Sequence, residues 1–409
     1  MKKIVSLALS AVMATGLVAG LAACGEKTYK IGMICLHGSA STYDKNFIDA
    51  MQQACANKGL SDQLTIVTDI EETNDCYATA KDLVDQGCEL IFADSFGHEA
   101  YMMQAAQEFP NVEFCHATGT SAQTAGLANF HNAFASIYEG RYLAGVAGGM
   151  KLKEMLDANE LQTKNFVDED TIKVGYVGAW PYAEVKSGYT SWFLGVQSVF
   201  EGTGYDVAMD VQFTNSWYDE TKESSAAKNL ISLGAALISQ HADSMGAPSA
   251  CEEAGVPNVS YNGSTATAAP NTYIISSRIN WVPYFEYIID CAINDQGTID
   301  ADWCGGLGSG TTYNDVSGSV VLTDVGTAAA QGTVAKLEEV RNALKAGTLK
   351  VFDCSKFTKD GVNLTSYTTS YGFEGECIVN DNGKYYFAES SRRSAPYFDI
   401  DIDGITIIS

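Results

Sequence analysis

The sequence predicts an α/β protein with two similar lobes, each built on a doubly wound parallel sheet and joined to the other by a hinge. Two observations support this. Short apolar runs alternate with amphipathic stretches of helical length from residue 29 onward, and the same alternation starts again at residue 173. Such alternation is typical of βαβ units. The length of 409 residues is enough for two or three domains.

The first lobe begins with a strand at 30–35, a polar loop and a helix at 46–58. Apolar side chains in that helix recur at the spacing of one helical face. The alternation continues with strands at 64–67, 90–93 and 112–115 and helices at 76–86 and 99–109. Each strand is short and apolar, as expected for strands covered by helices on both faces.

The second lobe begins with a strand at 173–177 and repeats the pattern. It continues with strands at 207–213 and 236–239 and helices at 185–200, 220–233 and 249–254. A helix at 136–150 stands between the lobes and contains a run of small residues at 144–149. Small side chains allow close packing, so we expect this helix to lie under a sheet or near the hinge.

Later segments are assigned to the two lobes by the same pattern. A strand at 273–276 and a helix at 282–293 are assigned to the first lobe, and a strand at 319–322 and a helix at 333–346 to the second. The last segment has short alternations such as Lys384-Tyr385-Tyr386-Phe387, typical of β-hairpins. The predicted division is 24–139 plus 270–310 for lobe 1, 140–269 plus 311–350 for lobe 2, and 351–409 for a β-rich C-terminal extension.

The N-terminus predicts export. A basic start is followed by an uncharged apolar run from Ile4 to Ala23, which indicates a signal peptide at 1–23. The run ends in Leu21-Ala22-Ala23-Cys24, which resembles a bacterial lipobox. We therefore expect Cys24 to carry lipid and to anchor the protein on the extracytoplasmic face of the cell membrane.

Composition excludes some partners. The chain has 25 Lys and Arg against 50 Asp and Glu, a net charge of −25. That charge disfavours nucleic acid and anionic lipid headgroups, which are themselves negative. None of the 11 cysteines forms a CxxC or a zinc-type Cys/His spacing. We expect no metal and no cofactor, mostly buried free thiols, and at most a disulfide between Cys354 and Cys377.

Residues that directly follow the strands are the candidates for ligand binding, because ligands in open α/β sheets lie beyond the carboxyl ends of the strands. These segments are 37–47, 94–98, 178–182, 214–219 and 240–245. Each combines an aromatic ring with a polar group or carries a polar pair. Rings that stack, together with a few directed donors and acceptors, suit a flat heteroaromatic ligand. The alternative is that these aromatic side chains only cover the ends of the sheets and bind no ligand.

Several segments resemble the basic-membrane-protein (BMP) family, the substrate-binding lipoproteins of ABC transporters that include the purine nucleoside receptors. They are KVGYVGAWPYAEVKSGYTSWFLGVQSVF (173–200), NSWYDETKE (215–223), QHADS (240–244), YEGRYLAG (138–145), NWVPYF (280–285) and Trp303 with Gly305-Gly306. The similarity is spread over roughly residues 29–350. Several separated segments are more specific than any one of them.

The resemblance implies a type I periplasmic-binding-protein fold, in which two lobes joined by three crossovers close on a ligand. It implies a receptor that delivers a purine base or nucleoside to an ABC permease. Phe47 with Phe96 or Trp180 would stack on the ring, and His241, Asp243 and Ser244 would bind its edge. With the strand-end residues, the candidate set is Tyr43, Asp44, Phe47, Ser95, Phe96, Trp180, Trp217, His241, Asp243, Ser244, Asn280 and Trp281.

The first loop departs from the nucleoside receptors of that family. They carry an Asn-Asp or Asp-Asp pair before Ser-Phe, whereas this chain has Tyr43 to Phe47 there, and Met51 or Gln52 replaces a sugar-contacting aromatic residue. This favours a free base such as adenine. Two alternatives stay open: a secreted nucleoside hydrolase that uses His241 with Asp243, and a receptor or sensor for another small ligand such as a sugar. We expect no enzymatic activity, because no nucleophile elbow or phosphate loop is present.

Overall fold

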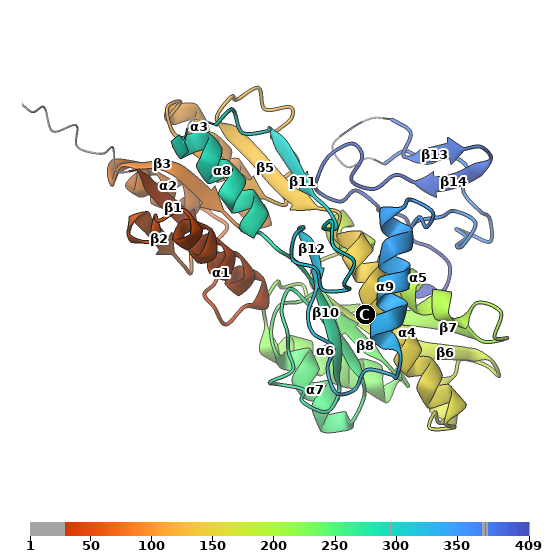
Figure 1. The fold of residues 1–409 in the computed structure, drawn as a ribbon. Helices are drawn as coiled ribbons and strands as arrows, with labels where there is room; N and C mark the ends of the chain where they lie inside the picture. Colours follow the sequence, from red (N-terminus) through yellow and green to blue (C-terminus); the bar gives the residue numbers. More distant parts are fainter. Residues whose placement is uncertain (1–28, 295, 370–372, 374, 409) are drawn as a thin grey trace, which may run out of the picture.

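The structure is a computed structural model that describes residues 29–294, 296–369, 373 and 375–408. It contains two α/β lobes and a C-terminal extension (Figure 1). The predicted signal peptide at 1–23 and the lipidation site Cys24 lie outside the described residues. Within the described part of the chain, no helix has the length and apolar character needed to cross a membrane.

The first lobe contains a fully parallel sheet in the order β11-β5-β4-β3-β1-β2. Its strands are β1 (Lys30–Ile34), β2 (Leu64–Val67), β3 (Cys88–Ala93), β4 (Glu113–Ala117), β5 (Phe130–Ala135) and β11 (Asp302–Gly305). Its helices are α1 (Thr42–Asn57), α2 (Asn74–Asp85), α3 (Glu99–Glu108) and α8 (Val282–Asn294). The apolar faces of α1 and α8 pack together on one face of the sheet, and those of α2 and α3 on the other.

The second lobe contains a sheet in the order β12-β10-β9-β8-β6-β7-β15, in which only β12 runs antiparallel to its neighbour among the described strands. Its strands are β6 (Thr171–Gly178), β7 (Asp206–Phe213), β8 (Ile238–Gln240), β9 (Asn258–Tyr261), β10 (Tyr273–Ile279), β12 (Val320–Leu322) and β15 (Ile405–Ile408). Its helices are α4 (Ile137–Asp157), α5 (Ala183–Phe200), α6 (Glu220–Ser232), α7 (Gly246–Ala254) and α9 (Thr333–Lys345).

The small residues of α4 allow it to touch α5 closely. A Cβ on Gly145 would stand 2.1 Å from the carbonyl oxygen of Trp192, and a Cβ on Gly195 would stand 2.2 Å from that of Tyr142. Any side chain at these positions would therefore force the helices apart. Because α4 also packs against β10, the run at 144–149 lies under the second sheet. Of the two placements expected from the sequence, under a sheet or near the hinge, this is the first.

Three connections join the lobes: β5 to α4, β10 to α8, and β11 to β12. The predicted assignment of 270–310 to the first lobe is wrong for its strand, because β10 pairs with β9 and β12 in the second sheet, whereas α8 packs on α1. Residues Tyr273–Ile279 are almost wholly buried, and a strand buried on both faces has the same pattern in either sheet. Only the packing decides where it goes.

The C-terminal extension has a two-stranded hairpin and a strand that joins the second lobe. Strands β13 (Ile378–Asp381) and β14 (Lys384–Phe387) form the hairpin, and β15 pairs in parallel with β7 at the sheet edge. Phe352 stacks on Phe398 at 4.2 Å between ring centroids and on Tyr138 of α4 at 5.5 Å. The disulfide that the sequence left possible between Cys354 and Cys377 is not formed, since both are buried free thiols.

Candidate ligand-binding site

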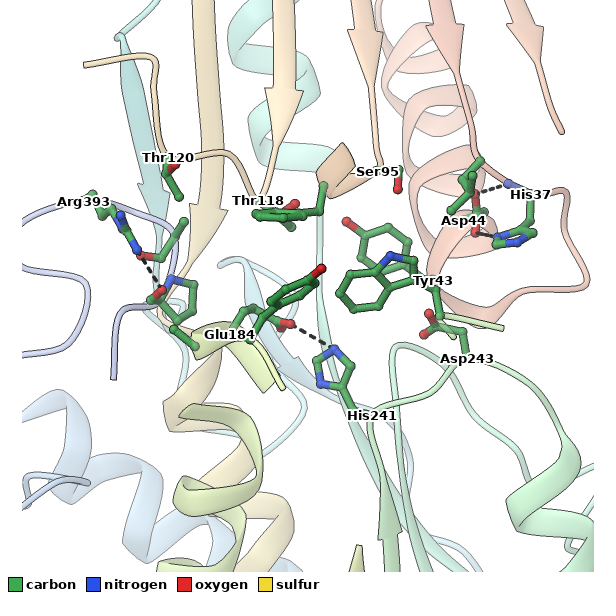
Figure 2. Close-up of a pocket in the computed structure, with 17 residues that line it drawn as sticks. His37, Tyr43, Asp44, Ser95, Thr118, Thr120, Glu184, His241, Asp243 and Arg393 are labelled. Carbon is green, nitrogen blue, oxygen red and sulfur yellow. Dashed lines mark hydrogen bonds and ion pairs between the residues drawn. The ribbon is translucent and has the colours of Figure 1, made fainter. Parts of the chain in front are cut away.

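A cavity of about 150 Å³ lies between the lobes, where the loops after their strands meet (Figure 2). The first lobe supplies loops after β1, β3 and β4, and the second supplies loops after β6, β7 and β8. The cavity is lined by Leu36, His37, Tyr43, Asp44, Ser95, Phe96, Thr118, Thr120, Tyr182, Ala183, Glu184, Trp217, His241, Asp243, Arg393, Ala395 and Pro396. The site therefore forms at the carboxyl ends of the strands, as the sequence predicts.

Seven of the twelve predicted ligand-binding residues line this cavity: Tyr43, Asp44, Ser95, Phe96, Trp217, His241 and Asp243. The structure places the other five elsewhere. Phe47 stacks on Trp281 at 4.4 Å between ring centroids, and both are buried in the first-lobe core. Both side chains are therefore part of the α1–α8 packing and lie away from the cavity.

The remaining three lie behind or beside the cavity. Trp180 stacks beside Tyr182 at 6.2 Å between centroids, and Ser244 is buried with its N–H donating to Glu223. Asn280 holds a crossover loop, because its Nδ2 donates to the carbonyl oxygens of Val316 and Gly318 at 3.0 and 3.1 Å. These residues support the site and its hinge without facing the ligand space.

Asp44 is a buried carboxylate held ionised by its neighbours. Ser41 caps α1 by accepting a hydrogen bond from the Asp44 N–H, which places Asp44 in the first turn of the helix. The His37 N–H donates to Asp44 Oδ1 at 2.7 Å, and His37 Nδ1 lies 3.5 Å from Oδ2. Burial opposes ionisation, but the hydrogen bonds from His37 and Ser41 outweigh it and lower the pKa of Asp44.

Asp94 and Cys35 lie beside Asp44 and are held neutral. Ligand atoms of Cys35, Asp44 and Asp94 all lie within 4.8 Å of one another. Burial, with the nearby charge of Asp44, raises the pKa of Asp94 well above its usual range, and burial raises that of the Cys35 thiol. The pKa values of these two neighbouring acids are thus shifted in opposite directions, lowered for Asp44 and raised for Asp94.

Asp243 joins the two lobes at the same end. Its Oδ1 accepts from Asn262 Nδ2 at 2.8 Å, and its carbonyl oxygen accepts from the N–H of Thr42 in the first lobe at 3.0 Å. Burial raises the pKa of Asp243 well above its ordinary value, and the charges of Glu223, Asp44 and Glu184 act in the same direction. This contact between the lobes therefore places Asp243 close enough to Asp44 for the two charges to interact.

His241 is paired with Glu184 and not with Asp243, the pairing on which the hydrolase hypothesis depends. His241 Nε2 lies 2.9 Å from Glu184 Oε2, as the dashed line in Figure 2 shows. Its other ring nitrogen, Nδ1, is buried without a hydrogen-bond partner among the described residues, and so is Thr118 Oγ1. Thr118 also has a φ of 67°, a left-handed conformation that is unusual for a β-branched residue.

Aromatic rings from both lobes face the cavity. Phe96 of the first lobe and Tyr182 of the second lie 5.3 Å apart between ring centroids, and Tyr182 lies 5.9 Å from Trp217. Phe96 and Tyr182 keep 38% and 37% of their surface exposed, so their ring faces are accessible. An edge of acids and a set of exposed rings can hold a flat, hydrogen-bonding molecule.

Sequence reasoning missed ten lining residues: Leu36, His37, Thr118, Thr120, Tyr182, Ala183, Glu184, Arg393, Ala395 and Pro396. His37 and Tyr182 lie in segments directly after strands, which the sequence did indicate as binding segments. Their position in the sequence could therefore have identified them. Thr118 and Thr120 follow β4, whose loop carries no aromatic residue next to the strand. Arg393, Ala395 and Pro396 come from the extension, and no sequence pattern connects them to the cavity.

Comparisons with known proteins identify the class. The family described as "ABC transporter substrate-binding protein PnrA-like" (Bmp) matches residues 33–305. A purine-binding protein of Brucella abortus (strain 2308) is 31% identical over 291 residues, which cover 70% of this chain and 74% of that protein. The protein is therefore a solute-binding component of an ABC transporter. The chain belongs to the Bmp family, which confirms the resemblance seen in the sequence.

Two further comparisons bear on relatives and fold. A protein of Haloferax volcanii named "Putative ABC transporter glucose-binding protein TsgA13" is 30% identical over 237 residues, which cover 58% of this chain and 54% of that protein. A solved ABC transporter solute-binding protein from Aeropyrum pernix K1 superposes with a TM-score of 0.64 at 14% identity, covering 82% of this chain and 94% of that one. The type I periplasmic-binding-protein fold is thereby established.

Proposed function

We propose that this protein is a lipid-anchored extracytoplasmic receptor that captures a purine base or nucleoside between its lobes and delivers it to an ABC importer. The observation that supports this most directly is the composition of the cavity. It combines exposed rings of Phe96 and Tyr182 with buried acids and with unpartnered polar atoms of Thr118 and His241. The purine-binding name of the Brucella relative points the same way.

The physical basis of recognition is stacking plus edge hydrogen bonds. A purine ring placed among Phe96, Tyr182 and Trp217 would gain stacking contacts on its faces. Carboxylate oxygens of Asp44 and Asp243 would accept its ring or amino protons. An analogue without those protons would leave a buried acceptor unpaired, which is costly. Strain at Thr118 is consistent with a binding role, because strained residues cluster at ligand sites.

A sugar is the second candidate ligand, because the Haloferax relative is named as glucose-binding. Aromatic rings and carboxylates also suit a hexose, whose hydroxyl groups need several acceptors. The two candidates differ in the ligand's π-face, so a purine should depend on Phe96 and Tyr182 more than a sugar does. We also propose that the protein has no hydrolase activity, because His241 pairs with Glu184 and the His241–Asp243 pair on which the hydrolase hypothesis depends is not formed.

The test is isothermal titration of the purified protein with adenine, hypoxanthine, guanine, their nucleosides and glucose. Mass spectrometry of ligand released on denaturation would name the native ligand. Saturable binding of a purine without product after long incubation supports the proposal. Binding of glucose alone, or free base released from inosine or adenosine, would contradict it.

The anchor needs a separate experiment, since it concerns residues near the N-terminus. The full chain and its Cys24→Ser variant would be expressed in a bacterium and fractionated. We expect the wild-type protein in the detergent-soluble membrane fraction, labelled by a radioactive fatty acid, and the variant unlabelled. A labelled Cys24→Ser protein would refute the assignment of the lipidated residue.

A further inference from the structure

The segment Ala388–Phe398 of the extension, here named the strap, crosses from one lobe to the other along the cavity. Glu389 Oε2 accepts from Ser187 Oγ of α5 at 2.8 Å, which ties the strap to the second lobe. The Ser394 N–H donates to Asp302 Oδ2 at 2.8 Å, and Asn132 Nδ2 donates to Ser394 Oγ at 3.0 Å, which tie it to the first. Glu389 and Ser394 are 5% and 2% exposed.

The strap also has a defined internal shape. Glu389 accepts from the N–H groups of Tyr397 and Phe398 at 2.8 and 3.0 Å, which closes the segment into a loop. The Arg393 guanidinium donates to the carbonyl oxygens of Ala395 and Pro396 at 3.1 and 3.3 Å. Since Ala395 and Pro396 are buried and their carbonyls are already bonded, their apolar surfaces form a fixed wall.

This wall and the acids lie at opposite ends of the cavity. Figure 2 shows Arg393 and Thr120 at one end and His37, Asp44 and Asp243 at the other. The family match covers residues 33–305, so the strap lies outside it. The acidic end thus belongs to the part of the chain that the family shares, and the opposite wall belongs to a segment beyond the match.

We propose that the strap is part of the binding site and restricts it to a bare heteroaromatic base, excluding the same base with a sugar attached. This inference rests on the proposed function and narrows its ligand class. A cavity of about 150 Å³ is the size that holds a benzene-like molecule, so a bicyclic base already fills it. A pentose added to that base would need space that the wall of Ala395 and Pro396 occupies.

The chemistry of the wall, like its shape, disfavours a ligand that carries a pentose. Hydroxyl groups of a pentose directed at Ala395 and Pro396 would be buried against apolar carbon, and the carbonyl oxygens there already accept from Arg393. A buried hydroxyl without a partner weakens binding. Moving the wall would break the bonds of Ser394 to Asp302 and Asn132, which oppose such a shift.

The experiment compares adenine with adenosine, and hypoxanthine with inosine, on wild type, Ala395→Leu and the control Ala388→Leu. Ala388 belongs to the strap but does not line the cavity. We expect wild type to bind each base at least tenfold more tightly than its nucleoside. Ala395→Leu should lose at least tenfold in affinity for the base. Ala388→Leu should bind both ligands as wild type does. Circular dichroism and thermal unfolding check that each variant is folded, and Ala395→Val replaces Ala395→Leu should the latter not fold.

The outcomes separate this inference from the proposed function. Equal affinity of wild type for base and nucleoside, or unchanged base affinity in the filled variant, overturns the role of the strap and leaves a purine receptor. Binding of no purine to wild type overturns the proposed function and this inference with it. Tighter nucleoside binding in Ala395→Gly, with base affinity kept, would support the wall directly.

Discussion

The two ends of the cavity are built on different principles. At one end, Asp44 lies buried in the first turn of α1, and Asp94 and Asp243 lie buried on loops that follow strands of the two sheets; the last two have raised pKa values. At the other end, Ala395 and Pro396 present apolar surface from a segment that follows both lobes in sequence. The first end offers buried acids, and the second offers a wall of apolar carbon beside Arg393 and Thr120. The proposed function therefore assigns recognition and size selection to different ends of the cavity.

The contrast extends to stability. Burial and neighbouring charges raise the pKa values of Asp94 and Asp243, so ionising either acid at this end is costly unless a donor is supplied to it. The strap, in contrast, adds hydrogen bonds to both lobes through Glu389 and Ser394. Variants at the two ends should therefore change different measured quantities.

The largest effect is expected at Glu223, which supports the acidic end from below. It accepts from the Ser244 N–H at 3.0 Å, and burial raises its pKa from 4.5 to about 7. The folded state therefore holds a proton that the unfolded state releases, so stability is full below pH 4.5 and falls as the pH rises to about 7. Glu223→Gln should reduce this fall by up to about 3 kcal/mol.

Urea unfolding across pH 4 to 9 measures that difference. Glu220→Gln is the matched control, because Glu220 lies in the same first turn of α6 and is exposed. The control should keep the pH profile of wild type. Parallel profiles for Glu223→Gln and wild type would show that Glu223 is not protonated in the folded protein.

The next largest effect concerns Asp243. Asp243→Asn should weaken binding of the base by about 1–3 kcal/mol, because it replaces one buried acceptor oxygen with a donor. Titration calorimetry measures the change, and Asp300→Asn, at an exposed position, serves as the control. Unchanged affinity would remove Asp243 from the recognition of the ligand edge.

A smaller effect is expected at the strap end. Ser394→Ala removes the hydroxyl that bonds Asp302 and Asn132 and should lower the free energy of unfolding by about 1 kcal/mol. Loss of this tie should also speed ligand dissociation, measured by stopped-flow fluorescence of the cavity tryptophan. Ser391→Ala, which affects bonds within the strap, should leave that rate unchanged. Equal rates in all three proteins would mean that the strap does not hold the lobes together.

The smallest effect is expected for Asp94→Asn. Because Asp94 does not line the cavity and burial raises its pKa well above the usual range, base affinity at pH 7 should change by less than about 0.5 kcal/mol in this variant. Titration at pH 7 measures the change beside that of Asp243→Asn. A loss as large as that of Asp243→Asn would show that Asp94 is ionised in the bound state and would make it a recognition residue.

The sequence by itself determined the alternation of strands and helices, the two lobes and the position of the site at the strand ends. These follow from local periodicity and from the rule that parallel strands direct their loops to one edge. It also identified Asp44, Phe96 and Asp243, whose residue types suit a flat polar ligand. The family followed from several such segments read together.

Only the tertiary structure decided which candidates face the cavity. Phe47 and Trp281 are as aromatic as Tyr182, but they meet each other across α1 and α8, whereas Tyr182 faces the opposite lobe. Likewise β10 could fit either sheet, and Ala395 and Pro396 carry no chemical signal at all. Contacts between segments far apart in the chain depend on how the lobes and the extension pack, and local sequence patterns do not record that packing.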